Sequence, residues 1–110
     1  MMQEPASLDR MFHALADRSR RGMIDRLGQG PASVSELAEP LSMALPTVMK
    51  HLGVLEESGL VRSVKTGRVR TYRLQQEALA NIERWLAERK ASWNSTFDRL
   101  DRFLADEQPD

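Results

Sequence analysis

The chain has 110 residues, of which 41% are hydrophobic and 29% are charged, and its 16 basic and 16 acidic residues give a formal net charge of zero. These values are typical of one globular domain with a small core. No apolar run approaches the roughly 20 residues of a membrane-spanning helix, and the sequence has no cysteine, which excludes disulfides and thiolate metal sites. The first six residues do not resemble a signal peptide, so we expect a cytoplasmic protein without membrane contact.

The charges are distributed unevenly along the chain. Residues 62–73 contain five basic side chains and no acidic one, although the whole chain is neutral. Such a basic block occurs on surfaces that bind nucleic acid, and it also occurs as a solvated charged loop. Composition alone leaves both interpretations open.

Two short helices are predicted at the N-terminal end. Ser7 is a candidate N-cap for a helix to about residue 16, whose apolar residues at helical spacing are Leu8, Met11, Phe12 and Leu15. Asp17 is a candidate N-cap for the second helix, in which Met23, Ile24 and Leu27 form the apolar stripe. Gly28, Gly30 and Pro31 then end it.

The next two predicted helices are joined by a turn of a few residues. The run Ser33-Val34-Ser35-Glu36 matches a capping box, and Pro40 limits the helix that follows to about two turns. In residues 45–55, one face of a second helix is apolar, with Leu45, Val48, Leu52 and Leu55. The other face presents Thr47, Met49, Lys50 and His51. Pro46 suits the first turn and Gly59 a left-handed stop. This pair is typical of a helix-turn-helix whose second helix reads DNA.

A β-hairpin is predicted after this pair, with strands at residues 60–65 and 68–74 and a turn at Thr66-Gly67. Val69 and Tyr72 do not share strict alternation, which predicts a bulge or twist in one strand. All five bases of residues 62–73 lie on this hairpin, which makes it a candidate wing.

A DNA-binding surface is predicted on the second helix of the pair and on the wing. Lys50 and Thr47 would contact base edges together with Met49 and His51, and the wing residues Lys65, Arg68 and Arg70 would meet phosphates or the minor groove. The alternatives are that Thr47 satisfies amides at the helix end, that His51 packs beneath the helix and that the wing arginines are solvated.

Residues 76–106 contain no proline or glycine and repeat apolar residues at about seven-residue spacing, which predicts a helix about 45 Å long. An uncovered stripe of this length favours packing against a second copy of the chain, with help from the first helix. The expected interface residues are Leu8, Met11, Phe12, Leu79, Ile82, Leu86, Trp93, Phe97 and Leu100. The alternative is two core helices with a break near residues 91–95.

No catalytic constellation is recognisable. The chain has two histidines, no glycine-rich phosphate loop after a strand and no H-E-x-x-H motif, so we expect neither an enzyme nor a metal or cofactor site.

Five segments resemble the ArsR/SmtB-type winged-helix repressors: residues 12–17 (FHALAD), 20–27 (RRGMIDRL), 35–38 (SELA), 48–61 (VMKHLGVLEESGLV) and 67–74 (GRVRTYRL). The resemblance implies a homodimer that binds a palindromic operator and is released by an inducer, either a small molecule or a protein. Metal-sensing members have a cysteine pair where this chain has residues 36–40, so the cysteine-free, non-metal-sensing subgroup is expected. Ala44 and Met49 stand where many members have serine, and Arg18 where proline is common.

These patterns predict a mainly α fold with a small β-hairpin (α+β), a winged helix-turn-helix in one domain over residues 1–110. Residues 7–75 would form the winged-helix core and residues 76–106 a C-terminal dimerisation helix. The predicted function is sequence-specific binding of double-stranded DNA as a transcriptional repressor or autorepressor. The alternative is a winged-helix interaction module that uses its basic face on an acidic protein.

Overall fold

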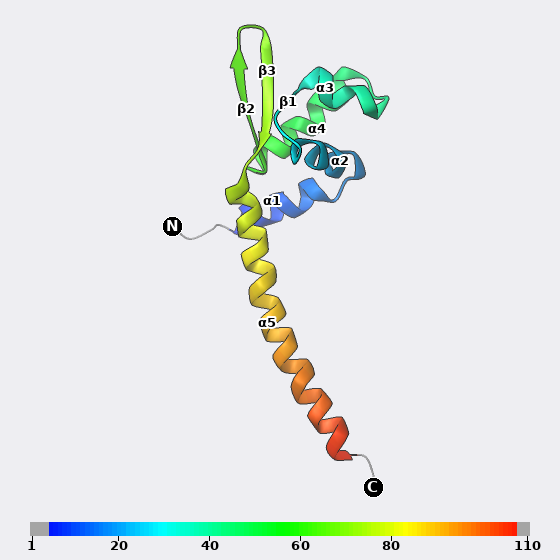
Figure 1. Cartoon of the computed structure of the whole chain (residues 1–110), viewed down its shortest axis with the longest axis vertical. Coiled ribbons are helices and arrows are strands. Elements are labelled where there is room, and N and C mark those ends of the chain that lie inside the picture. Colours follow the sequence, from blue (N-terminus) through cyan, green and yellow to red (C-terminus); the bar gives the residue numbers. More distant parts are fainter. Residues whose placement is uncertain (1–4, 108–110) are drawn as a thin grey trace. The chain divides into compact units, whose positions relative to one another are not determined.

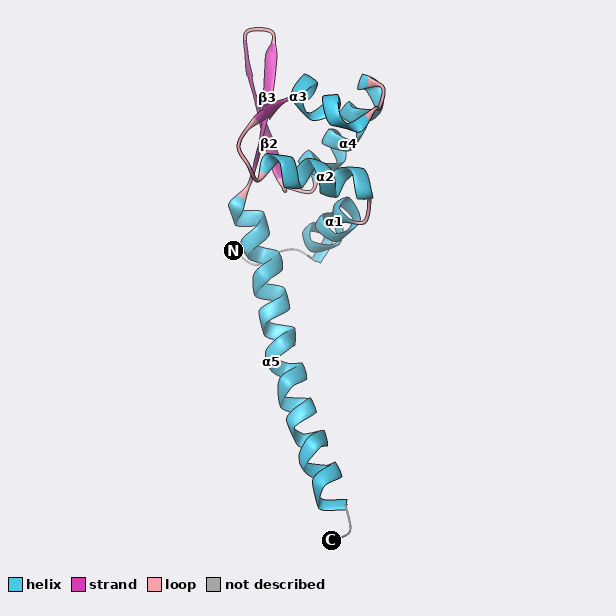
Figure 2. Cartoon of the chain, turned by 45° about the vertical axis from the view of Figure 1, so that its right-hand side comes forward, coloured by secondary structure: helices cyan, strands magenta, loops and turns pink. Residues whose placement is uncertain are grey.

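The computed structural model describes residues 5–107 of the chain (Figures 1 and 2). Its elements, in chain order, are α1 (Pro5–Leu15), α2 (Arg18–Leu27), β1 (Ala32–Ser33), α3 (Val34–Ala38), the 3₁₀ helix η1 (Glu39–Leu41), α4 (Leu45–Glu57), β2 (Val61–Thr66), β3 (Val69–Leu74) and α5 (Gln76–Glu107). They form two compact units, one that reaches to Leu79 and one that begins at Ala80. The predicted mainly α fold with a small hairpin is confirmed, while the division at residues 75 and 76 stays a prediction.

The core of the first unit is built from the apolar faces of its helices and the base of its sheet. The side chains that bury most volume there are Met23, Leu37, Val48, Leu52, Leu55, Leu60 and Val61. Among the described side chains, no buried polar atom lacks a hydrogen-bond partner. This core fixes α4 against the other elements of the unit.

The sequence predicted the start of α2 correctly but not the start of α1. Helix α1 already begins at Pro5, so the predicted start after Ser7 is wrong; a proline is well tolerated in a first turn, where its missing N–H has no helical partner. Asp17 caps α2 as predicted, because its carboxylate accepts a hydrogen bond of 3.0 Å from the Arg20 backbone N–H.

The capping box at the start of α3 is confirmed. The Ser33 hydroxyl accepts from the Glu36 backbone N–H at 3.3 Å, and the Glu36 carboxylate accepts from the Ser33 N–H at 3.0 Å. Hydrogen bonding of the Glu36 carboxylate to the Ser33 backbone N–H, and next to the Ser33 side chain, lowers the pKa of Glu36. Pro40 lies in η1 and Ser42 follows with a φ of 50°, which turns the chain into α4.

Helix α4 presents Val48, Leu52 and Leu55 to the core, and all three are fully buried. The prediction that Leu45 shares their burial is wrong, since 52% of its surface is exposed. Leu45 is the first residue of the helix, at the end where the neighbouring elements leave the apolar face uncovered. Gly59 stops the helix with a φ of 84°, as predicted.

The sheet has three antiparallel strands in the order β1-β3-β2 (Figure 1). The two residues of β1 were not predicted; they pair with Tyr72 and Thr71 of β3. Strands β2 and β3 pair without interruption from Val61↔Leu74 to Thr66↔Val69, so of the predicted bulge or twist the bulge is absent. Val69 is 54% exposed, so it does not share the buried face of the sheet on which Tyr72 lies. The turn is Gly67-Arg68, one residue later than predicted.

Helix α5 is uninterrupted over 32 residues, and the alternative with a break near residues 91–95 is wrong. From Ala80 to Glu107 none of the described residues is buried within the chain, and the apolar side chains there are largely exposed. In the part of the chain that the structure describes, no helix combines the length and apolar character needed to cross a membrane.

Candidate nucleic-acid interface

One face of α4 is open to solvent and rich in hydrogen-bonding groups. Thr47, Met49 and Lys50 are all exposed on it, opposite the buried leucines. Helix α4 has no side-chain N-cap, and the Thr47 hydroxyl makes no hydrogen bond to another described residue. The alternative role of Thr47, satisfying amides at the helix end, therefore finds no contact to support it. Three neighbouring side chains are left available to an external partner.

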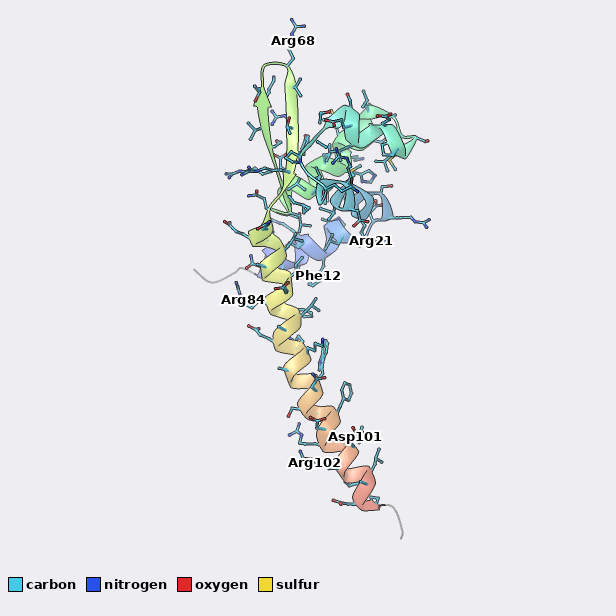
Figure 3. All side chains as sticks on the ribbon, in the orientation of Figure 1. Phe12, Arg21, Arg68, Arg84, Asp101 and Arg102 are labelled. Carbon is cyan, nitrogen blue, oxygen red and sulfur yellow. The ribbon has the colours of Figure 1, made fainter. Side chains whose placement is uncertain are left out.

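The wing carries its bases next to this face. Lys65 and Arg70 are direct partners across the β2–β3 ladder, and Arg68 lies in the turn at the tip. Figure 3 shows the Arg68 side chain extending from the end of the hairpin, away from the helices of this unit. All three side chains are exposed.

Arg70 is also held toward the reader helix. Its guanidinium donates to the Ser63 hydroxyl at 2.8 Å, and this hydroxyl donates to the Glu56 carboxylate of α4 at 2.9 Å. This chain of hydrogen bonds links both strands of the wing to α4. Arg70 therefore links the wing to α4 and also contributes a positive charge to the surface.

A hollow of about 360 Å³ joins the two predicted contact regions. It is lined by Ser33, Val34, Ser35, Met49, Lys65, Arg68, Val69 and Arg70. The start of α3, the exposed face of α4 and the wing thus form one continuous surface with three bases. Ser33 and Ser35 were not predicted to belong to it, since the sequence indicates only the capping role of Ser33.

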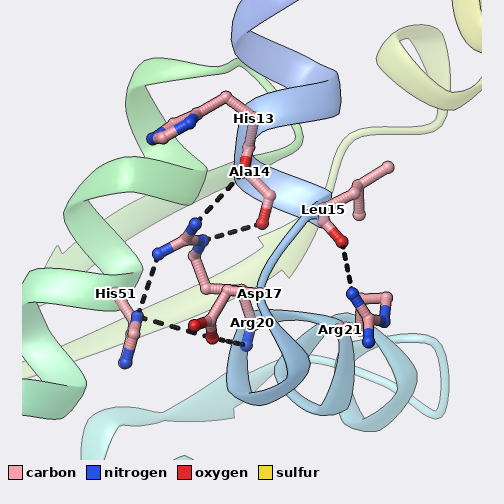
Figure 4. A network of polar contacts seen from close by, with 7 residues as sticks. All are labelled: His13, Ala14, Leu15, Asp17, Arg20, Arg21 and His51. Atoms are coloured by element: carbon pink, nitrogen blue, oxygen red, sulfur yellow. Dashed lines mark hydrogen bonds and ion pairs between the residues drawn. The ribbon is translucent and has the colours of Figure 1, made fainter.

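His51 lies apart from this surface, in a polar network under α4 (Figure 4). Its Nδ1 accepts from the Arg20 guanidinium at 3.2 Å and lies 3.9 Å from the Asp17 carboxylate, and its side chain is only 17% exposed. This position agrees with the alternative that His51 packs beneath the helix, and its contact with the groove stays a prediction. The hydrogen bond from the Arg20 backbone N–H lowers the pKa of Asp17.

Arg20 is the residue of this network that sequence reasoning missed. Its guanidinium also donates to the carbonyl oxygens of Ala14 at 2.7 Å and His13 at 3.1 Å, so it fastens the end of α1 to α4 (Figure 4). The contact with His51 spans 31 positions, and no local pattern indicates it. Only the position of Arg20, three residues after the Asp17 cap, is a signal.

The residues predicted for a dimer interface lie in both units and are described separately. In the first unit Phe12 is 39% and Leu79 36% exposed, Leu8 is half-buried, and Met11 is buried at 3%. Met11 therefore packs in the core and offers no surface to a partner. In the second unit Ile82 is half-buried, and the exposed members of the set are Leu86, Trp93, Phe97 and Leu100.

Within residues 5–107, no group of three or more histidine, aspartate or glutamate side chains is arranged to hold a metal ion. The full sequence has no cysteine. The exposed chemistry of the first unit is thus a reader helix with polar side chains beside a basic wing. This arrangement defines a winged helix-turn-helix protein of the DNA-binding class.

Comparisons with known proteins identify the family. A helix-turn-helix domain model matches residues 15–64. The HTH-type transcriptional regulator Rv2034 of Mycobacterium tuberculosis is 43% identical over 76 residues, which cover 69% of this chain and 71% of the relative. The crystal structure of an ArsR family transcriptional regulator, RHA00566, is 50% identical, with a TM-score of 0.80 over 86% of this chain and 98% of the other.

A second similar structure is a homodimeric winged helix-turn-helix DNA-binding domain from Mycobacterium bovis, 26% identical, with a TM-score of 0.62 over 86% of this chain and 84% of that one. The chain belongs to the ArsR family of DNA-binding transcriptional regulators. The predicted family is confirmed.

Proposed function

We propose that this regulator acts as a homodimeric repressor, or autorepressor, at a palindromic operator. The observation that carries the proposal is the exposed face of α4, with Thr47 and Lys50, beside the basic wing. Bound at the operator, the protein would occlude promoter DNA.

The two parts of this surface have different tasks. Lys50 can donate to guanine O6 and N7, and Thr47 can bond base edges or touch a thymine methyl, each good base contact discriminating by about 1 to 3 kcal/mol. Met49 would add an apolar contact in the same groove. Arg68 and Lys65 would meet phosphates or the minor groove, which supplies affinity with little sequence information. Arg70 would contribute there while it holds the wing to α4.

A second copy of the chain is the partner proposed for the apolar stripe of α5. The exposed residues Leu86, Trp93, Phe97 and Leu100 would pack on their counterparts, and Leu8, Phe12, Leu79 and Ile82 would extend the interface. An exposed stripe of this size on a lone chain would be a site of association. The homodimeric relative from Mycobacterium bovis supports this assembly. Twin reader helices would then sit about one DNA turn, roughly 34 Å, apart.

The inducer is proposed to be other than a metal ion. A cysteine-free chain cannot supply thiolate ligands, and residues 36–40, where metal-sensing members have a cysteine pair, read ELAEP. We propose a cytoplasmic protein without a cofactor, released from DNA by a small molecule or a partner protein. Family membership favours DNA over an acidic protein as the partner of the basic face.

Fluorescence anisotropy with labelled DNA from upstream of the chain's own gene tests the proposal. We expect saturable binding whose affinity falls steeply as salt rises, because each phosphate contact releases counterions. Absence of salt-dependent binding to any promoter fragment would overturn it. Sedimentation equilibrium in the same buffer should give twice the 12.5 kDa mass of the chain.

A further inference from the structure

Two arginines of the basic hairpin take no part in the proposed DNA surface. Arg62 and Arg73 are direct partners across the β2–β3 ladder, and both side chains are exposed. Neither guanidinium forms a hydrogen bond or ion pair with another residue of the described chain. Like charges that face each other across a ladder repel, so an anion bound between the two arginines would relieve this repulsion.

The register of the hairpin separates this pair from the DNA-facing bases. Successive residues of a strand point to opposite faces, so Arg62 and Arg73 lie on the face opposite to Lys65 and Arg70. They also lie near the base of the hairpin, whereas Arg68 lies at its tip. The pair is therefore poorly placed to share a phosphate track with the tip.

A hollow of about 750 Å³ adjoins this pair. Arg62 and Arg73 form one wall of it, and Gln29, Gln75 and Gln76 contribute amides that can donate or accept hydrogen bonds. Its lining holds a single carboxylate, that of Glu77, against the two guanidiniums. The volume lies within the range of roughly 300 to 1,000 Å³ that is usual for small-molecule sites.

The opposite wall is held in place by its own hydrogen bonds. In the α2–β1 loop, the N–H groups of Gly28 and Gly30 donate to carbonyl oxygens of α2 at 2.9 and 3.1 Å. The Arg26 guanidinium donates to the Gly30 carbonyl at 3.1 Å and lies 3.6 Å from the Glu36 carboxylate. A wall fixed in this way gives the hollow a defined shape before any ligand arrives.

We infer that this hollow binds a small organic dianion, with one guanidinium fork on each negative charge or both forks on one phosphate group. Arginine pairs suit this chemistry because each planar fork donates two parallel hydrogen bonds to a carboxylate or phosphate. Pro31 and Leu74 line the same hollow and give the carbon skeleton an apolar contact. Bound there, the ligand contacts both the base of the wing and the α2–β1 loop. If the proposed function holds, this ligand is the inducer.

NMR titration of the ¹⁵N-labelled full chain, without DNA, tests the inference. The probes are succinate, a dicarboxylate, and glycerol 3-phosphate, a phosphomonoester, with acetate as the monoanion control. The titrations are done at about 0.15 M salt, where exposed charges are screened beyond roughly 8 Å. We expect one of the two dianions to give saturable shifts at the amides of Gln29, Arg62 and Arg73, and acetate to give none.

Three variants with the same loss of charge separate a site from general attraction. Arg62→Gln and Arg73→Gln should each weaken the probe by roughly tenfold or more, since hydrogen bonds to charged groups are among the stronger ones. Arg68→Gln, on the same hairpin but outside the hollow, should leave probe affinity unchanged. Circular dichroism of each variant checks that the exposed substitution leaves the fold intact.

Three results would overturn the inference. The first is that neither dianion gives saturable shifts up to about 10 mM, where binding would be worth less than roughly 3 kcal/mol. The second is that Arg68→Gln weakens the probe as much as Arg62→Gln. The third is that Arg62→Gln and Arg73→Gln lower DNA affinity as much as Arg68→Gln in the absence of any dianion. The probe titration contains no DNA, so its failure is distinct from a failure of the proposed function.

Discussion

Arg20 and Arg21 are neighbours on α2 that offer a matched test of how the reader helix is held (Figure 4). Arg20→Ala removes the two bonds to carbonyl oxygens of α1 and the bond to His51 on α4. Arg21→Ala removes one exposed bond, of 2.8 Å, to the Leu15 carbonyl. Both changes remove one positive charge and place a good helix former in α2, so their difference isolates the network.

The expected losses follow from the number and burial of these bonds. Hydrogen bonds to charged groups contribute about 1.5 to 3 kcal/mol each when well shielded, and those of Arg20 are only partly buried. We therefore expect Arg20→Ala to lower the free energy of unfolding by about 2 to 3 kcal/mol in total. Arg21→Ala should stay within about 0.5 kcal/mol, as is usual for an exposed substitution.

Urea unfolding followed by circular dichroism measures both values. One fixed protein concentration is needed, because the stability of a self-associating chain depends on concentration. If Arg21→Ala destabilises the protein as much as Arg20→Ala, then the network does not fasten α4 and the reasoning is refuted.

Three further predictions concern the core, acid stability and self-association. Leu52→Ala should lower the free energy of unfolding by about 3 kcal/mol and the half-exposed Leu45→Ala by less than about 1 kcal/mol; equal losses in urea unfolding would contradict the orientation of α4. The pKa of Asp17 is lowered from 3.8 by a backbone hydrogen bond, so its carboxylate stabilises the fold above about pH 4 and this contribution is lost as the pH falls further. Asp17→Asn should therefore destabilise the protein at pH 7 and flatten the acid limb of a stability-versus-pH curve, and an unchanged limb would refute this. Phe97→Asp should shift sedimentation equilibrium toward the monomer, whereas Ser95→Asp, on the other side of α5, should leave it unchanged; equal shifts would contradict packing through the stripe.

Local patterns were sufficient to predict much of the fold. The capping box at Ser33 and Glu36 and the helical recurrence of Val48, Leu52 and Leu55 act within a few residues, and the structure has both. The wing was predicted from β-rich runs on either side of a turn, with its turn shifted by one residue. These signals depend on residues that are close together in the sequence, so they can be recognised without the tertiary structure.

The features that were missed depend on distant contacts. Strand β1 has two residues, too few for an alternation pattern, and exists because β3 lies beside it. The exposure of Leu45 depends on what fails to cover the end of α4. The sequence left two positions open for His51, because its contact with Arg20 lies 31 residues away. The pairing of Arg62 with Arg73 follows from an uninterrupted register, which the sequence did not fix because it left a bulge or a twist open. Each of these needs the assembled fold.

The central claim is that the exposed face of α4 reads base sequence while the wing supplies affinity, and the ratio of affinities for operator and shuffled DNA tests it most directly. Fluorescence anisotropy of Lys50→Ala should show this ratio falling by roughly 5- to 150-fold, the equivalent of about 1 to 3 kcal/mol. Arg68→Ala should weaken both DNAs alike and reduce the salt slope by about one. If Lys50→Ala weakens operator and shuffled DNA equally and leaves the ratio unchanged, then α4 does not read the operator through Lys50 and the account is contradicted.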